Sequence, residues 1–341
     1  MRPITHSMPK QLVPVANKPI LFYAIEAMKA AGITRIGIVV GDTEAEIRGA
    51  VGSGERWGVT ITYLRQLAPL GLAHAVLISQ EFLGKDPFVM YLGDNLILDG
   101  IQTFIRAFEV DQPNALILLA ESPNPEQFGV VEVCDGEVLG LEEKPSKPKS
   151  NLVLVGVYLF DAMVHEAVAA IEPSARGELE ITDAIQYLLD HNGRVRSHVI
   201  TGRWKDTGRL DDLLEANRIL LDRIESEILG EVDAASRIEG RVVLEPGARV
   251  ISSVIRGPAI VGSNTVVTES YIGPFTSIYR GVTFTHSQVE HSIILENTRI
   301  VNVPGRITDS LIGKDVVVTS GVDHQRVFRF VLGDHSHVEV P

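Results

Sequence analysis

Two aspartates, Asp94 and Asp206, stand where side chains could bind a metal ion. Asp94 closes the stretch "VMYLGDN", in which an apolar strand would lead to a carboxylate at its tip, and Asp206 stands in "RWKDTG". Mg²⁺ prefers oxygen ligands, and a site made of two carboxylates leaves positions for substrate phosphates. Two such aspartates meeting at one sheet edge would form this site. Taken singly, Asp94 is equally consistent with the N-cap of a helix, and Asp206 with an ordinary loop.

Three cationic side chains have neighbours that suit an anion. Lys10 lies in the proline-rich opening "MRPITHSMPKQLVPV", which would present Lys10 and Gln11 from a constrained loop. Lys144 stands beside Glu143 in "LEEKP", between two expected strands. Arg176 precedes an expected helix in "SARGELEITD", and helix N-termini favour anions. Any one of these cations alone is more often solvated surface.

The stretch "QLAPLGLAHA" offers a glutamine and a glycine at a strand end. The Gln66 side chain and the Gly71 backbone together have the donors and acceptors to bind the edge of a pyrimidine. His74, in the helix that follows, is expected to be packed or solvated. Further along, His286 and His291 raise the alternative of an acyltransferase, although a structural role for them is favoured.

Composition limits the class of protein. The 341 residues are 45% hydrophobic and 22% charged, so we expect a globular chain of about two domains. The net charge of −13 excludes a general attraction to nucleic acid or to anionic membranes. The single cysteine, Cys134, excludes an internal disulfide and is consistent with a reducing cytoplasm. With no apolar run of membrane-spanning length, the sequence predicts a soluble, cytoplasmic protein.

The elements that position these residues follow two patterns. Up to about residue 230, amphipathic helices alternate with β-branched strands, such as the helix at 17–33 and the strand at 34–41. This alternation predicts an α/β domain over 1–230 with a doubly wound, mostly parallel sheet. Past Gly129 the strands in "GVVEVCDGEVLGLEEKP" and "SNLVLVGVYLF" become hairpin-like, which indicates an insertion or an antiparallel extension of the sheet. A long helix at 210–229 would lead out of the domain.

The second pattern, over 231–341, is a six-residue period typical of a parallel β-helix. Ordinary antiparallel strands are the alternative, but they rarely stay in phase for so long. The tail "QRVFRFVLGDHSHVEV" would supply closing strands, and the flat faces of stacked coils predict a homo-oligomer. The apolar positions counted in sixes are Val242, Ala248, Val254, Ile260, Val266, Ile272, Ile278 and Phe284, and after a slip of four Ile294, Ile300, Ile312 and Val318, with Arg306 the one lapse.

Taken together, seven stretches resemble the sugar-1-phosphate nucleotidylyltransferases, and most closely the long glucose-1-phosphate thymidylyltransferases with a C-terminal left-handed β-helix. They lie in family-like order and spacing between residues 3 and 208: "PKQLVPVANKPILFY", "APLGLAHAV", "YLGDN", "FGVVEV", "LEEKP", "SARGELEITD" and "WKDTG". The resemblance implies transfer of a nucleotide from dTTP to glucose 1-phosphate, which gives dTDP-glucose and pyrophosphate for deoxysugar biosynthesis. A UTP-using enzyme or another sugar specificity is the alternative.

The resemblance also implies roles for single residues. Lys10, Asp94, Lys144 and Asp206 would carry the catalysis, with Mg²⁺ on the two aspartates. Because the nucleophile is already a phosphate oxygen, in-line positioning and charge neutralisation would suffice. The triphosphate would contact Lys10, Gln11 and Asp94, and the base Gln66 and Gly71. The residues implied for the sugar 1-phosphate are Gly129, Glu143, Lys144 and Arg176.

The start of the chain departs from the family pattern. In the family the loop before "RPIT" reads Gly-Gly-x-Gly-Thr-Arg-Leu, and Met1 stands where that Leu belongs. We therefore expect the chain as given to lack the first strand, the glycine-rich loop and its Arg; Arg2 does not replace that Arg. A misassigned or trimmed start is the favoured explanation, and a non-catalytic relative that binds nucleotide sugars is the alternative.

Overall fold

The computed structural model describes residues 8–200, 204–207 and 209–320, and of Asp206 it describes the backbone only. Met1, Arg2, Gly208 and the expected closing strands after residue 320 lie outside the described residues. Two compact units emerge: a sheet unit, Leu21–Asp206, and a solenoid unit, Met1–Ile20 with Thr207–Pro341. This division differs from the predicted domains 1–230 and 231–341, because the hairpin at residues 14–19 and the helix after residue 209 contact the solenoid or each other.

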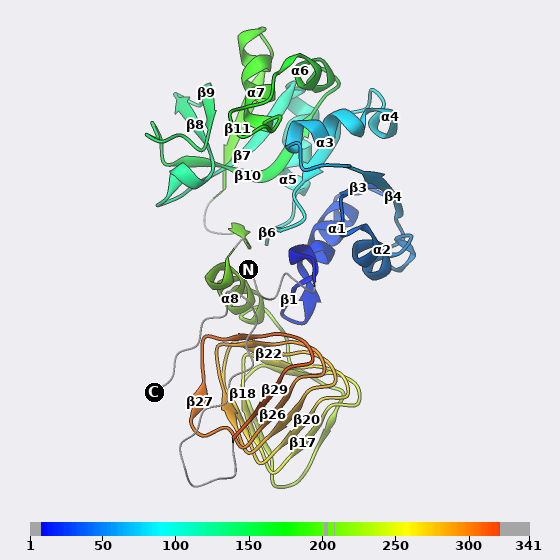
Figure 1. Cartoon of the computed structure of the whole chain (residues 1–341), viewed down its shortest axis with the longest axis vertical. Coiled ribbons are helices and arrows are strands. Elements are labelled where there is room, and N and C mark those ends of the chain that lie inside the picture. The colour runs from blue at the N-terminus through cyan, green and yellow to red at the C-terminus, as the bar shows by residue number, and fades with distance from the viewer. Residues whose placement is uncertain (1–7, 201–203, 208, 321–341) are drawn as a thin grey trace. The chain divides into compact units, whose positions relative to one another are not determined.

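The sheet unit is built around a six-stranded sheet in the order β11-β7-β10-β8-β9, with β5 on β10 (Figure 1). Two small pairs, β3 with β4 and β6 with β12, accompany it. The strands of the unit are β3 (Arg35–Val40), β4 (Thr60–Arg65), β5 (Phe88–Tyr91), β6 (Asn95–Ile97), β7 (Ala115–Glu121), β8 (Gly129–Cys134), β9 (Glu137–Glu143), β10 (Leu152–Phe160), β11 (Val195–Val199) and β12 (Trp204–Asp206).

The predicted α/β class is confirmed, but the sheet is mixed where mostly parallel pairing was predicted. β7 pairs with β11 in parallel, as β3 does with β4. β10 pairs antiparallel with β5, β7 and β8. The reason is that β10 returns from the antiparallel hairpin β8–β9 and enters the middle of the sheet. Antiparallel strands past Gly129 were predicted and are confirmed, but the sequence did not predict that one of them lies in the middle of the sheet.

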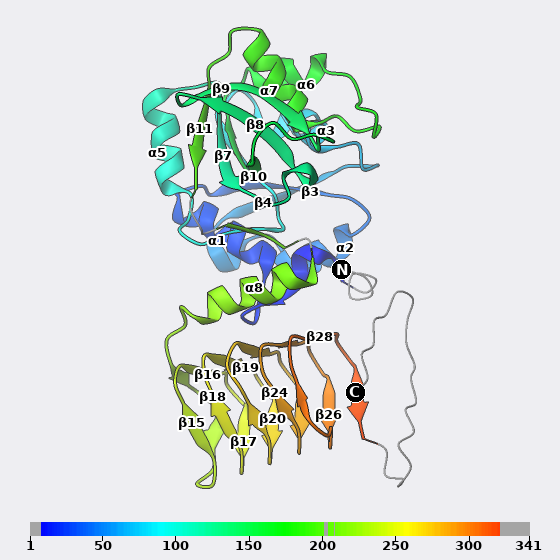
Figure 2. The same cartoon turned by 90° about the vertical axis from the view of Figure 1, so that its left-hand side faces the viewer.

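Helices cover both faces of the sheet. Such cover is needed because alternate residues of β7 are apolar and point to opposite faces. Ala115, Ile117 and Leu119 pack toward α3, α6 and α7, whereas Leu116 and Leu118 pack toward α5. Figure 2 shows α5 and the α6–α7 pair on opposite faces. The helices of the unit are α1 (Ile20–Ala30), α2 (Glu44–Val51), α3 (Leu72–Ile78), α4 (Gln80–Leu83), α5 (Gln102–Asp111), α6 (Val164–Ala170) and α7 (Ile181–Asp190).

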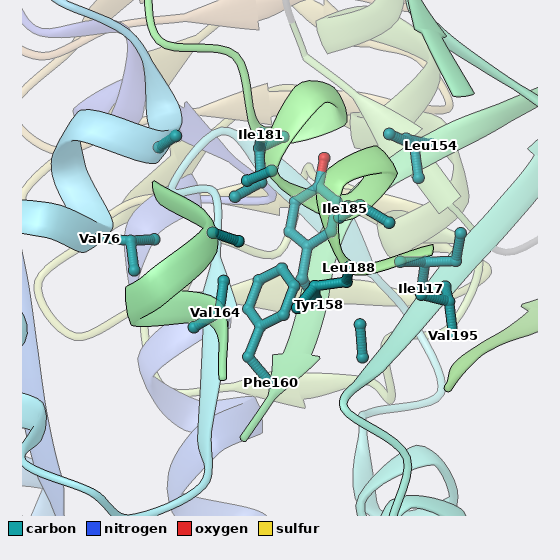
Figure 3. Packing of buried hydrophobic residues seen from close by; sticks show 14 of the residues in the cluster. Val76, Ile117, Leu154, Tyr158, Phe160, Val164, Ile181, Ile185, Leu188 and Val195 are labelled. Carbon is teal, nitrogen blue, oxygen red and sulfur yellow. The ribbon is translucent and has the colours of Figure 1, made fainter. Parts of the chain in front are cut away.

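The α7 helix shows why this packing is stable. Its buried residues Ile181, Ala184, Ile185 and Leu188 recur at helical spacing and form one apolar stripe. The stripe packs on the face of β10 that carries Tyr158 and Phe160, whose rings stack 6.0 Å apart (Figure 3).

The solenoid unit contains a parallel β-solenoid of three sheets, as predicted; its left-handed winding stays a prediction. The sheets have the orders β13-β16-β19-β22-β25-β28, β14-β17-β20-β23-β26-β29 and β15-β18-β21-β24-β27. Their strands are β13 (Glu227–Ile228), β14 (Glu231–Val232), β15 (Arg237–Glu239), β16 (Val242–Leu244), β17 (Arg249–Ile251), β18 (Val254–Arg256), β19 (Ala259–Val261), β20 (Val266–Thr268), β21 (Tyr271–Ile272), β22 (Thr276–Ile278), β23 (Thr283–Thr285), β24 (Gln288–Val289), β25 (Ile293–Ile294), β26 (Arg299–Val301), β27 (Arg306–Ile307), β28 (Leu311–Ile312) and β29 (Val317–Thr319).

The predicted count in sixes is wrong in phase at three positions. Val242 pairs with Ala259 and Ala259 with Thr276, each 17 residues along the chain. Three steps of six cover 18 residues, so the count moves from Val242, the first residue of β16, to Ile260, the middle residue of β19. Three residues of the count lie outside the solenoid core, and their neighbours occupy it: Ile255 for Val254, Val261 for Ile260 and Val267 for Val266.

Three further elements belong to the solenoid unit. A 3-10 helix spans Lys10–Leu12, a short hairpin pairs β1 (Pro14–Val15) with β2 (Lys18–Pro19), and α8 spans Leu210–Leu221. The α8 helix contacts both β1 and β22. Among the helices that the structure describes, none is long and apolar enough to cross a membrane.

Candidate active site

The tip that carries Asp94 lies beside the backbone of Asp206. Asp94 sits in the turn between β5 and β6, and its Oδ1 accepts a hydrogen bond from Asn95 Nδ2 at 3.1 Å. β6 pairs antiparallel with β12, which puts Asp206 directly opposite Asn95. Asp94, 112 positions before Asp206 in the chain, thus directly precedes the residue that pairs with Asp206. The predicted meeting of the two side chains stays a prediction, since only the Asp206 backbone is described.

Asp94 and Asp206 are the predicted carboxylate ligands of a divalent cation at this tip. Within the described ranges, no cluster of three or more His, Cys, Asp or Glu residues could hold a metal ion. A site of two carboxylates would therefore need substrate oxygens to complete its coordination, which is how Mg²⁺ commonly binds with phosphates. The strand pairing of Asp206 with Asn95 fits such a site.

The Asp94 tip is held by two residues that the sequence analysis did not single out. The Asn95 side chain is buried, and its Oδ1 accepts hydrogen bonds from Trp204 Nε1 at 2.5 Å and from the Gly156 N–H at 3.3 Å. The Trp204 ring packs edge-on against Phe128 at 5.9 Å. Trp204 thus links the aspartate tip to the strand that begins at Gly129.

The predicted base-reading pair, Gln66 and Gly71, comes together. Gln66 Nε2 donates to the Gly71 carbonyl at 3.1 Å and lies 3.0 Å from His74 Nδ1, so His74 orients the glutamine. Gly71 has φ 99°, and a Cβ there would lie 2.4 Å from the Leu179 carbonyl oxygen. Position 71 therefore requires glycine, because the backbone of Leu179 occupies the space that a side chain would need.

The four residues predicted for the sugar phosphate form a cluster around Glu143. Gly129 and Glu143 are partners in the β8–β9 ladder, and a Cβ on Gly129 would approach Glu143 Oε2 to 3.1 Å. Glu143 Oε1 accepts from Arg176 Nη1 at 3.2 Å and lies 3.9 Å from Lys144 Nζ. Lys144 has φ 43°, and its N–H donates to the Phe128 carbonyl. The fold therefore brings together the four residues that the resemblance implies for the sugar 1-phosphate; their role stays a prediction.

Electrostatics around Glu143 depend on further carboxylates that the sequence analysis missed. Arg176 contacts Glu178 at 3.1 Å and the buried Glu180 at 3.5 Å. Burial, with the negative charge of Glu180 second, raises the pKa of Glu143 in spite of Lys144 and Arg176. Both glutamates stand in "RGELEITD", where the alternation of acidic residues around one arginine was the available signal.

Lys10 and Gln11 belong to the solenoid unit. Both lie on the 3-10 helix that follows Pro9, with Lys10 exposed and Gln11 half-buried. The Val13 N–H donates to the Lys10 carbonyl, and the Val13 and Val15 side chains are fully buried. The predicted constrained loop is therefore present at Lys10–Leu12.

The two solenoid histidines have structural partners. His286 Nε2 lies 2.7 Å from Glu269 Oε2, and the His291 ring packs 5.2 Å from Phe275. His286 and Glu269 line an open groove of about 550 Å³ with Tyr271 and Gln288. These contacts give the acyltransferase alternative no specific support.

Comparison with known proteins gives one consistent result. Residues 1–223 match the family model described as nucleotidyl transferase. The whole chain is 54% identical to a glucose-1-phosphate thymidylyltransferase of Streptomyces griseus over 341 residues, and 54% identical to one of Streptomyces antibioticus over 342. Each match covers 100% of this chain and 96% of the relative. A crystal structure from Bacillus anthracis, assigned as a glucose-1-phosphate thymidylyltransferase in complex with sucrose, aligns with a TM-score of 0.62 at 35% identity; the match covers 67% of this chain and 92% of that one.

Proposed function

The chain belongs to the nucleotidyl transferase family, and we propose that it transfers a thymidylyl group from dTTP to glucose 1-phosphate. The similarity along the whole length to two proteins named glucose-1-phosphate thymidylyltransferase supports this choice of substrates. The observation that carries the proposal is the cluster of Gly129, Lys144 and Arg176 around Glu143, since it combines two cations for a phosphate with a carboxylate for sugar hydroxyls.

In the proposed reaction a phosphate oxygen of glucose 1-phosphate attacks the α-phosphorus of dTTP. The new P–O bond forms as the bond from the α-phosphorus to the bridging oxygen breaks, and pyrophosphate leaves with that electron pair. Lys144 and Arg176 would hold the attacking phosphate, and Lys10 and Gln11 the triphosphate. The residues need only align and neutralise charged groups, because the nucleophile is already ionised.

We include a divalent cation, Mg²⁺, in the proposal. Asp94 and Asp206 would hold it, supported by the pairing of Asp206 with Asn95 in the β6–β12 ladder. When bound, the cation would neutralise negative charge on the triphosphate. The remaining coordination would come from phosphate oxygens and water.

The base would be bound by Gln66 and Gly71. In support, the hydrogen bond from Gln66 to the Gly71 carbonyl and the contact with His74 fix the glutamine amide in one orientation. A fixed amide is suited to hydrogen bonding with a base edge. A cytoplasmic location, where nucleoside triphosphates and sugar phosphates are made, is part of the proposal, and the homo-oligomer expected from the solenoid stays a prediction.

The test is a substrate panel on the purified full chain. We expect pyrophosphate release that requires dTTP, glucose 1-phosphate and Mg²⁺ together, with a lower kcat/KM for UTP. Glu143→Gln should raise the KM for glucose 1-phosphate, whereas Glu137→Gln, an exposed glutamate at the far end of β9, serves as the control. Binding of dTDP-glucose without turnover of any pair would favour the non-catalytic alternative.

A further inference from the structure

The hairpin that follows Lys10 and Gln11 has an unusual turn. Its two central residues, Ala16 and Asn17, have φ values of 45° and 58°. Such turns suit hairpins but favour glycine and asparagine, so alanine at the first position is strained. Strained residues persist where surrounding contacts hold them, and they often mark functional positions.

The contacts that hold this turn come from α8 and the solenoid. The Ala16 N–H donates to Asn217 Oδ1 on α8 at 2.8 Å. Asn17 Nδ2 donates to the Ile278 carbonyl at 2.8 Å and to Glu245 Oε1 at 3.3 Å. The turn is therefore fastened at both residues to elements more than 200 positions away in the chain.

Asn217 joins three elements through one buried amide. It is 1% exposed, and its Oδ1 accepts from the Ala16 N–H and from Ser277 Oγ at 2.6 Å. Its Nδ2 donates to the Phe275 carbonyl at 3.1 Å. One side chain thus connects the hairpin, the α8 helix and the β22 strand.

The contact between Asn217 and Ser277 is polar, although its surroundings are apolar. On the outer face of its sheet, Ser277 is flanked by Ile260 and Ile293, which are also buried. Apolar residues at Ser277 and Asn217 would have continued this row, but they would have left the Ala16 N–H and the Phe275 carbonyl without the Asn217 amide as partner. A buried hydrogen-bonded pair instead fixes a single register, which is the best-supported use of buried polar groups.

We propose that Asn17 and Asn217 are positioning residues that make the solenoid a fixed support for Lys10 and Gln11. The path is short: the 3-10 helix at Lys10–Leu12 leads through the buried Val13 into the hairpin. The inference rests on the proposed function, in which Lys10 and Gln11 contact the triphosphate. It gives the solenoid a role in nucleotide binding besides any role in assembly.

The test compares Asn17→Gly with Asn302→Gly. Glycine keeps the positive φ at residue 17 but removes both side-chain hydrogen bonds. Asn302 has the same φ of 58° and an exposed side chain at a corner of the solenoid, so it is a matched control. We expect Asn17→Gly to lower kcat/KM for dTTP about tenfold, since small misplacements of binding groups have large effects. The KM for glucose 1-phosphate should stay unchanged, because its proposed residues lie in the sheet unit.

A second pair of variants covers Asn217. Asn217→Leu removes all three hydrogen bonds, whereas Asn217→Asp keeps an acceptor for Ala16 and Ser277. We expect kcat/KM for dTTP to fall in the order wild type, Asn217→Asp, Asn217→Leu. Equal effects of Asn17→Gly and Asn302→Gly, or equal increases in both KM values, would overturn the inference.

An independent readout separates this inference from the proposed function. Amide hydrogen exchange of the segment 8–20 needs no substrate, and it should be faster in Asn17→Gly than in wild type or Asn302→Gly. Faster exchange in a chain without thymidylyl transfer would reject the proposed function and keep the anchoring of this segment. Unchanged exchange would reject the inference, whatever the activity.

Discussion

Gly71→Ala tests whether the loop that carries the proposed base contact is fixed by the backbone of Leu179. Gly71 has φ 99° and ψ 173°, a conformation open in practice to glycine alone. An added Cβ would lie 2.4 Å from the Leu179 oxygen and 2.8 Å from its nitrogen. Leu179 is not free to withdraw, because its N–H donates to Leu70 and its carbonyl accepts from Ala73.

Two costs add in this variant. The backbone strain of alanine at a positive φ is about 1–3 kcal/mol, and forcing an extra carbon into filled space adds about 1–3 kcal/mol. Gly84→Ala is the matched control, since Gly84 has φ 67° and nothing within 4 Å of an added Cβ. The control carries only the backbone strain, so the difference in free energy of unfolding should be about 1–3 kcal/mol.

Urea unfolding measures the stability difference, and steady-state kinetics measure the consequence for the site. Relief of the overlap requires the loop to withdraw by roughly 1 Å, which can cost about 10²-fold in rate. The withdrawal would also break the Gln66 hydrogen bond to the Gly71 carbonyl, so kcat/KM for dTTP should fall. Gly84→Ala should leave the kinetics unchanged. Equal losses of stability in the two variants would refute the role of Leu179.

Two further predictions concern charge. Glu180→Gln removes a negative charge that raises the pKa of Glu143, so the acid limb of the pH profile of kcat/KM for glucose 1-phosphate should move to lower pH; Glu178→Gln, which contacts the same Arg176, should move it less. A shift to higher pH would contradict this assignment. Asp94→Asn should lower kcat by about 10²–10³-fold and raise the Mg²⁺ concentration for half-maximal rate, and chelation of the wild type should abolish turnover reversibly. Unchanged Mg²⁺ dependence in Asp94→Asn would remove Asp94 from the proposed metal site.

The fold brings together residues that lie in separate motifs of the sequence, whereas the pairing of the sheet that carries them differs from the prediction. Glu143 and Lys144 stand in one motif and Arg176 in another, and the resemblance to a family, not residue type or local spacing, grouped them. The antiparallel entry of β10 between β7 and β8 is a pairing between distant strands. Hydrophobic periodicity reports which faces of a strand are buried, but β10 is buried on both faces in either orientation, so its pattern carried no information on its partners.

The solenoid illustrates the same limit within a repeat. A count of six detected the repeat, because every coil turns three corners and buries short aliphatic strands. Three sides of six residues would need 18, so a coil of 17 residues has one side that is shorter. Only the strand pairing shows which side is the short one. Ile260 looked like a core residue for this reason, although its outward position continues the row that includes Ser277.

The contact between Asn217 and the hairpin could not be predicted from the local sequence, because its partners lie far away in the chain. Asn217 lies in a helix whose buried residues Leu213, Ala216 and Leu221 predict an ordinary apolar stripe, and a single asparagine in that stripe is most simply a tolerated polar residue. Its importance becomes visible only when Ala16, Ser277 and the Phe275 carbonyl converge on one amide. Replacing Asn217 by an apolar residue would leave the Ala16 N–H and the Phe275 carbonyl without this partner, and an unsatisfied polar group away from water is costly. These contacts therefore indicate that asparagine at position 217 has a specific role. The hairpin that Asn217 holds directly follows Lys10 and Gln11.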